Sequence, residues 1–161
     1  MDTRKLVAID PGLSGGIVCR NMQTVTSYKM PDTPAGIVEL FKHIQNPDGL
    51  GHCTCFVLME KVGKHRMGNS ASSSATFSRH VGHLEMALLA LQISHETIMP
   101  TAWMNDVAPG RPKGADAPTV RLRKRFIKDQ MQRKFPDQKI TNYTADAFGI
   151  LTYLIRHSEK Y

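Results

Sequence analysis

Three acidic residues stand in surroundings that suit chemistry. Asp10 and Glu60 each end a short apolar run, and Asp146 lies between two alanines near the start of an expected helix. The apolar runs are typical of buried strands. Successive strands of such a unit are commonly neighbours, so their carboxyl ends are expected to bring Asp10 and Glu60 together. A helix packed across that edge would add Asp146.

Three carboxylates in one place repel one another unless a divalent cation neutralises them. Hard oxygen ligands suit Mg²⁺ or Mn²⁺. Two such ions about 4 Å apart activate water and stabilise the leaving oxygen of a phosphodiester. Taken singly, Asp10 is also typical of a turn, Asp146 of a helix start and Glu60 of an exposed strand end. Their combination is what indicates a metal-dependent nuclease.

The elements that must position these acids follow from the hydrophobic pattern. An antiparallel meander is expected at the N-terminus, and alternating helices and strands follow it. This order predicts an α/β domain over residues 1–161, with a mixed, central, five-stranded sheet flanked by helices. The expected strands cover 5–10, 17–19, 24–28, 55–59 and 97–100, and the expected helices cover 33–46, 77–91, a short stretch from 101, 120–134 and 144–156.

The charge of the chain suggests its partner. Among its 161 residues, 21 Lys and Arg oppose 14 Asp and Glu, which gives a net charge of +7. A surplus of this size favours a polyanion, nucleic acid first and an acidic membrane surface second, although a basic but ordinary enzyme fits equally. No apolar run is long enough to span a membrane. Three cysteines, an odd and sparse set, lead us to expect an intracellular, reducing compartment.

The segments around the acids resemble RuvC-type Holliday junction resolvases of the phage and organellar branch. Residues 6–16 (LVAIDPGLSGG) are similar to the family's first strand and 56–60 (FVLME) to its second catalytic strand. Residues 100–103 (PTAW) resemble a segment after the fifth strand, and 144–151 (TADAFGIL) the terminal catalytic helix. The segments come in the family's order and span nearly the whole chain. The resemblance implies a ribonuclease-H-like fold, a homodimer, and paired nicks in four-way DNA junctions.

The resemblance also implies roles for single residues. Asp10, Glu60 and Asp146 would hold Mg²⁺ or Mn²⁺. The family usually adds an Asp or His about one turn before the last acid, where this chain has Asn142 and Tyr143. Asn142 offers an oxygen as the fourth ligand. Family members carry a catalytic lysine near the start of the preceding helix, and here Lys124 and Lys128 are both candidates.

Two basic segments are candidate DNA contacts. A polar loop directly after Glu60 resembles the junction-probing loop of the chloroplast and phage branch. The expected helix over 120–134 carries four basic residues at i, i+3, i+4 and i+7, which places them on one face. A solvated face and a solvated loop are the ordinary alternatives. The candidate DNA-contacting residues are Lys61, Lys64, His65, Arg66, Lys113, Arg121, Lys124, Arg125 and Lys128.

The long helix over 77–91 has an apolar surface wider than one stripe, so it is expected to serve as core, dimer seam or both. Other functions remain open. Another ribonuclease-H-like nuclease would share the three acids without needing a dimer. A catalytically idle junction-binding protein is favoured by the Asn142-Tyr143 departure. A sugar-kinase or actin-like ATPase needs two such domains, whereas 161 residues hold one.

Overall fold

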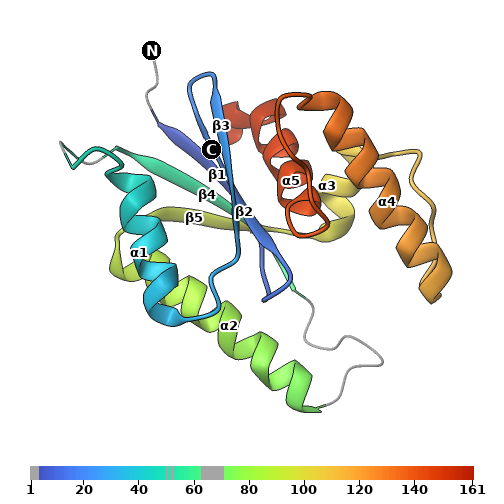
Figure 1. The fold of residues 1–161 in the computed structure, drawn as a ribbon, viewed down its shortest axis with the longest axis horizontal. Coiled ribbons are helices and arrows are strands. Elements are labelled where there is room, and N and C mark those ends of the chain that lie inside the picture. The colour runs from blue at the N-terminus through green and yellow to red at the C-terminus, as the bar shows by residue number, and fades with distance from the viewer. Residues whose placement is uncertain (1–3, 50, 52, 63–70) are drawn as a thin grey trace.

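The computed structural model describes residues 4–49, 51, 53–62 and 71–161 (Figure 1). One mixed sheet of five strands forms its centre, in the order β3-β2-β1-β4-β5. The first three strands are antiparallel, and β4 and β5 run parallel to β1. The sheet therefore confirms the predicted architecture. The strands are β1 (Lys5–Asp10), β2 (Gly16–Asn21), β3 (Thr24–Lys29), β4 (Cys55–Glu60) and β5 (Ser94–Ile98).

Helices cover both faces of the sheet (Figure 1). Two of them pack on one face and three on the other, and each layer has its own hydrophobic core. Within the described residues no helix is long and apolar enough to cross a membrane. The first face carries α1 (Pro34–Gln45) and α2 (Ala71–Ala90), and the second carries α3 (Pro100–Val107), α4 (Ala117–Lys134) and α5 (Ala145–Arg156), with a 3-10 turn at Ser158–Lys160.

Several element boundaries differ from the sequence prediction; for example, α2 begins at Ala71, before the expected 77, and β5 begins at Ser94, before the expected 97. The fifth strand was expected to end at Pro100, but it ends at Ile98, and Pro100 instead opens α3. Proline suits the first turn of a helix because its missing N–H has no partner to lose there. Helix α4 starts at Ala117, earlier than expected, because the Asp116 side chain accepts a hydrogen bond from the Thr119 amide at 2.9 Å. That contact caps the helix.

Alternation along β1 and β4 separates the two cores. Val7 and Val57 pack with α1 and α2, whereas Ala8 and Leu58 pack with α3, α4 and α5. This is the period of two that a central strand requires when both of its faces are covered. It also fixes the direction of every later side chain on these two strands.

Helix α5 lies on the centre of the sheet, against β1, β2 and β4. Its close approach depends on Gly16, because a Cβ there would lie 2.5 Å from the carbonyl oxygen of Tyr143. At the other end of the sheet both ends of the described chain meet on Phe56. The Arg4 guanidinium lies 5.4 Å from the centre of that ring, and the Tyr161 ring lies 5.0 Å from it.

Candidate active site

The strand register places Asp10 beside Glu60. The parallel pair runs in register as far as Ile9 opposite Met59, so the next residues of the two strands are neighbours. By the alternation of the strands, both acids share the face of Ala8 and Leu58, which is the face that α5 covers. Asp10 is partly exposed, whereas Glu60 is 8 % exposed.

The third acid is delivered by the start of α5. Gly16 pairs with Asp10 across the first hairpin. The backbone just before α5 lies against Gly16, since a Cβ on that glycine would be 3.2 Å from the Cα of Thr144. Asp146, partly exposed, lies in the first turn of α5. The sheet and the helix therefore bring the three acids to one end of the molecule, as the sequence predicted.

The donor set fits a hard divalent cation, because it consists of carboxylate oxygens at the partly exposed carboxyl ends of β1 and β4 and the start of α5. The side chains are not closed around a common point, however. Within the part of the chain that the structure describes, no three His, Cys, Asp or Glu side chains form a ready metal site. Each of the three acids takes part in at least one interaction within the protein. Metal binding by Asp10, Glu60 and Asp146 thus stays a prediction.

Glu60 has a specific buried partner. The indole Nε1–H of Trp103 donates a hydrogen bond to Glu60 Oε2 at 2.7 Å. Trp103 is 1 % exposed. Burying a carboxylate is costly unless it is hydrogen-bonded, and a bond from a neutral donor to a charged oxygen is among the stronger ones. Sequence reasoning placed Trp103 in a short helix but gave no sign of this contact, which joins residues on separate elements.

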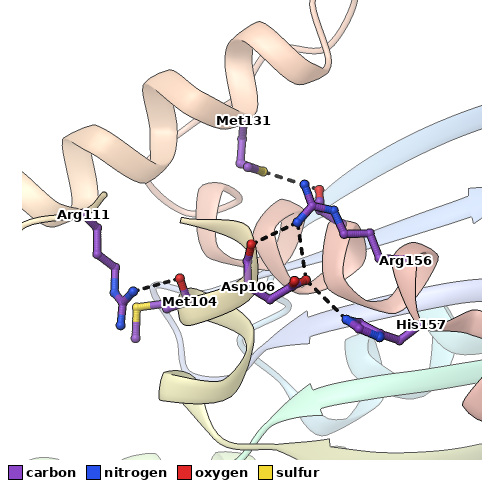
Figure 2. Close-up of polar contacts among 7 residues, drawn as sticks. Met104, Asp106, Arg111, Met131, Arg156 and His157 are labelled. Atoms are coloured by element: carbon purple, nitrogen blue, oxygen red, sulfur yellow. Dashed lines mark hydrogen bonds and ion pairs between the residues drawn. The ribbon is translucent and has the colours of Figure 1, made fainter. Parts of the chain in front are cut away.

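Helix α3, which carries Trp103, is tied to α5 at its carboxyl end (Figure 2). Arg156 donates to the Asp106 carbonyl at 3.0 Å and lies 3.5 Å from its carboxylate, and His157 Nε2 lies 3.4 Å from the same carboxylate. Arg111 donates to the carbonyl oxygens of Met104 and Ala108, at 2.8 and 3.1 Å. These bonds satisfy the last carbonyls of α3 and fix its position.

Comparison with solved structures identifies the architecture. The structure of Thermus thermophilus RuvC matches with a TM-score of 0.57 at 15% identity, covering 96% of each chain. T. thermophilus RuvC in complex with a Holliday junction substrate matches with a TM-score of 0.59 at 13% identity, covering 95% of each chain. The chain has the RuvC fold. The yeast mitochondrial Holliday junction resolvase matches with a TM-score of 0.48 at 13% identity, over 96% of this chain and 78% of its own. No protein-family model and no curated protein matches the sequence significantly.

On this RuvC fold the turn before α5 holds the candidate fourth ligand. Thr144 Oγ1 accepts a hydrogen bond from the Thr141 amide at 3.0 Å, which closes the turn. Asn142 is exposed on that turn. The ring of the exposed Tyr143 lies 5.6 Å from Lys29 Nζ. The turn therefore leaves the Asn142 side chain accessible at the end of the sheet that carries the acids, and its role as a ligand stays a prediction.

The basic helix is α4, which packs on α5 and leaves its charged side outward. Arg121, Lys124 and Arg125 are exposed and Lys128 is half-buried, while Ile127 and Met131 point into the core. In Figure 1 the amino-terminal part of α4 extends toward the end of the molecule where β1 and β4 finish. Leu122, which helical spacing would allow to pack inward, is instead 57% exposed.

Of the other predicted DNA contacts, the structure describes Lys61 and Lys113. Lys61 is exposed, and its amide donates to the Ile98 carbonyl at 2.7 Å, which extends the pairing of β4 with β5. Lys113 is exposed on the loop before α4. Lys64, His65 and Arg66 lie outside the described residues, so their roles stay predictions from the sequence.

The turn that follows Asp10 packs against α2. Gly12 has a φ of 108°, and a Cβ there would lie 2.8 Å from the Phe77 ring. His80, on the same helix, is 5 % exposed, and its Nε2 has no hydrogen-bond partner among the described residues. Burial, and then the nearby His83, lower the pKa of His80. The helix under the Asp10 turn therefore carries a neutral histidine near pH 7.

Proposed function

We propose that the protein is a Holliday junction resolvase, a Mg²⁺- or Mn²⁺-dependent endonuclease that acts on branched DNA as a homodimer. The observation that carries this proposal is a RuvC-fold sheet in which Asp10 and Glu60 end neighbouring strands, with the start of the helix that bears Asp146 packed against the same end. A similar structure, that of T. thermophilus RuvC, holds a Holliday junction substrate. The net charge of +7 suits the same polyanionic ligand.

The chain's own residues divide the work in this proposal. The three carboxylates hold the cations, with Asn142 as a further oxygen donor. When bound, the cations activate water and stabilise the leaving oxygen. The exposed basic side chains of α4 bind phosphates, and Lys124 or Lys128 is the lysine that acts at the scissile phosphate. Lys61 and the loop that follows it lie next to Glu60 in sequence, which suits a role in choosing the branch point.

The primary experiment compares a labelled four-way junction with a matched linear duplex, with and without Mg²⁺. We expect paired nicks in the junction alone and only with the cation. Glu60→Gln should abolish nicking and leave junction binding intact, because it removes a charge and keeps the shape. Glu39→Gln, an exposed change on α1, is the matched control and should cut normally. Full activity of the Glu60 variant would refute the metal-site assignment.

The dimer is the second part of the proposal. Two symmetric nicks need two sites related by a two-fold axis. Helix α2 presents Met86 and Leu89 with 63% and 61% of their surfaces exposed, which suits a contact with a second copy. Sedimentation at micromolar concentration should give about twice the 18.0 kDa of one chain. Leu89→Glu should yield monomers, whereas Met22→Glu, at an equally exposed turn residue, should not. A monomer that still cuts both strands together would contradict this part.

The basic helix is tested by salt. Changing Lys124 and Lys128 to alanine should weaken binding to junction and duplex alike. It should also reduce the slope of log affinity against log salt by about one for each phosphate that is no longer neutralised. Lys42→Ala, an exposed lysine on α1, should leave the slope unchanged. The sequence also predicts that changing Lys64 and His65 to alanine alters junction preference or cleavage position with less effect on the slope. Equal losses and identical cleavage maps for both sets of variants would show one undivided electrostatic surface.

A catalytically idle junction-binding protein is the second candidate. Asn142 in place of an acidic or histidine ligand favours it, as does the open arrangement of the acids. Such a protein would bind the four-way junction with the same salt dependence and cut it under no cation condition. The cleavage assay with Mg²⁺ and with Mn²⁺ therefore separates the two.

A further inference from the structure

Trp103 is the one tryptophan of the chain, and it lies where two parts of the candidate site meet. Its indole N–H donates to Glu60 Oε2 at 2.7 Å. The far edge of the same ring lies on α5, because a Cβ at Gly149 would be 2.5 Å from Trp103 Cζ3. Both the tryptophan and the glutamate are buried. The ring therefore touches a candidate ligand on β4 and the helix that carries another.

The indole has little freedom to move away from Glu60. An indole nitrogen is a donor only, so it cannot switch roles with the carboxylate. Its helix is held by the Asp106 contacts with Arg156 and His157 and by Arg111 on its last carbonyls (Figure 2). The missing side chain at Gly149 makes the space for the ring. Backbone and packing thus hold the donor in one place.

Glu60 is equally constrained on its own strand. Its Cα pairs with that of Ile98, and the next amide, of Lys61, donates to the Ile98 carbonyl. With its backbone paired to β5 and Oε2 bonded to Trp103, the Glu60 carboxylate is restrained from both ends of the side chain. Gly149 follows Asp146 by three positions, which places both on neighbouring parts of one helix face. The ring therefore also sets the spacing between Glu60 and the helix that bears Asp146.

We propose that Trp103 is a positioning residue that holds Glu60 through Oε2, orients its carboxylate toward the divalent cation, and couples that carboxylate to α5. This inference rests on the proposed function, since it assigns Glu60 to the cation site. Partners that orient metal ligands in this way typically change metal affinity by about 10- to 100-fold when they are removed. The effect should appear in cation binding and not in DNA affinity.

The test uses the full chain labelled with ¹⁵N in the tryptophan ring, which gives one indole N–H resonance. Adding Mg²⁺ should shift that resonance, and Glu60→Gln should shift it in the absence of any cation. Calorimetric titration with Mn²⁺ should show binding about 10- to 100-fold weaker in Trp103→Phe, which keeps a ring beside Gly149 and removes the donor. Excess Mn²⁺ should restore cleavage by that variant, with unchanged KM for the junction. Tyr28→Phe, which removes an aromatic donor on β3, should behave as wild type.

A second replacement guards against misfolding of the phenylalanine variant. Placing β-(3-benzothienyl)alanine at position 103 keeps the shape of the indole and replaces N–H by sulfur, so it should weaken Mn²⁺ binding in the same way. The inference is overturned if both variants bind Mn²⁺ as wild type does, or if the indole resonance ignores Glu60→Gln. A wild-type protein that binds Mn²⁺ tightly but never cuts junctions would refute the proposed function and leave this inference standing. If the wild-type protein cuts junctions and both variants bind Mn²⁺ as tightly as wild type, the proposed function stands and this inference is refuted.

Discussion

Two helical glycines give a sharp test of the packing behind the site, because the same substitution should act in opposite directions. A Cβ at Gly149, in α5, would lie 2.5 Å from Trp103 Cζ3, and atoms on two sides of that ring position would be 3.1 Å away. A Cβ at Gly82, in α2, would meet nothing within 4 Å. Alanine favours a helix interior over glycine by about 0.8–1.0 kcal/mol. Gly82→Ala should therefore stabilise the fold by roughly that amount.

Gly149→Ala gains the same propensity but collides with the indole. If the ring stays, overpacking costs about 1–3 kcal/mol. If the ring retreats, the buried Glu60 carboxylate loses a hydrogen bond worth about 1.5–3 kcal/mol. Subtracting the gain of about 1 kcal/mol leaves a net loss of about 0–2 kcal/mol if the ring stays and about 0.5–2 kcal/mol if it retreats. For a chain of this size each kcal/mol moves Tm by about 2–4 °C.

The measurement is thermal and urea unfolding of both variants at a concentration where sedimentation shows monomers. Monomers are required because Gly82 lies on the helix proposed to contact a second copy. Gly82→Ala should raise Tm, and Gly149→Ala should lower it and also move the indole N–H resonance. The reasoning fails if Gly149→Ala is as stable as Gly82→Ala, because the tight contact between Trp103 and α5 would then be absent.

Three further outcomes are expected from groups outside the acidic site. The folded pKa of His80 lies below the ordinary 6.5, so the unfolded chain binds the proton first as the pH falls. The free energy of unfolding should therefore decrease below about pH 6.5, and His80→Leu should flatten the curve measured by urea unfolding. Burial raises the pKa of the Cys19 thiol to about 12, so iodoacetamide at pH 8 should alkylate the half-buried Cys53 first, as mass spectrometry of the native protein will show. Asp106→Ala should cost only about 0.2–1 kcal/mol, because its ion pairs are partly exposed, and a double-mutant cycle with Arg156 measures that coupling.

Much of the fold could be predicted from the sequence because local pattern determines it. The apolar runs ending in Asp10 and Glu60 predicted two neighbouring strands, and the register confirms them. Element boundaries were harder to predict where a residue type suits both the end of one element and the start of the next. Pro100 closes an apolar run in sequence but opens α3 in space. Leu122 fits the inward stripe of α4 by spacing, yet it is exposed.

The site was predictable only as far as the strands and the last helix determine it. The adjacency of Asp10 and Glu60 follows from the register of β1 and β4, and sequence reasoning reached it. A shared metal site with Asp146 stays a prediction. The bond from Trp103 to Glu60 spans 43 positions, and the close approaches at Gly16 and Gly149 depend on how helices lie on the sheet. Nothing in local spacing encodes those contacts. A glycine inside the last helix, where alanine would be the better helix former, was the one local sign of a close neighbour.

The contacts of Arg4 and Tyr161 with the same ring, that of Phe56, have a consequence for engineering. Phe56 is the second residue of β4 whereas Glu60 is its last, so Arg4 and Tyr161 lie at the end of the sheet opposite the acids. Ends that lie close together tolerate being joined. A short linker from residue 161 to residue 4, with new ends opened at the exposed turn around Met22, should give a circular permutant with the same three-dimensional site. Fluorophores or surface tethers attached near Arg4 or Tyr161 would likewise stand away from Asp10 and Glu60.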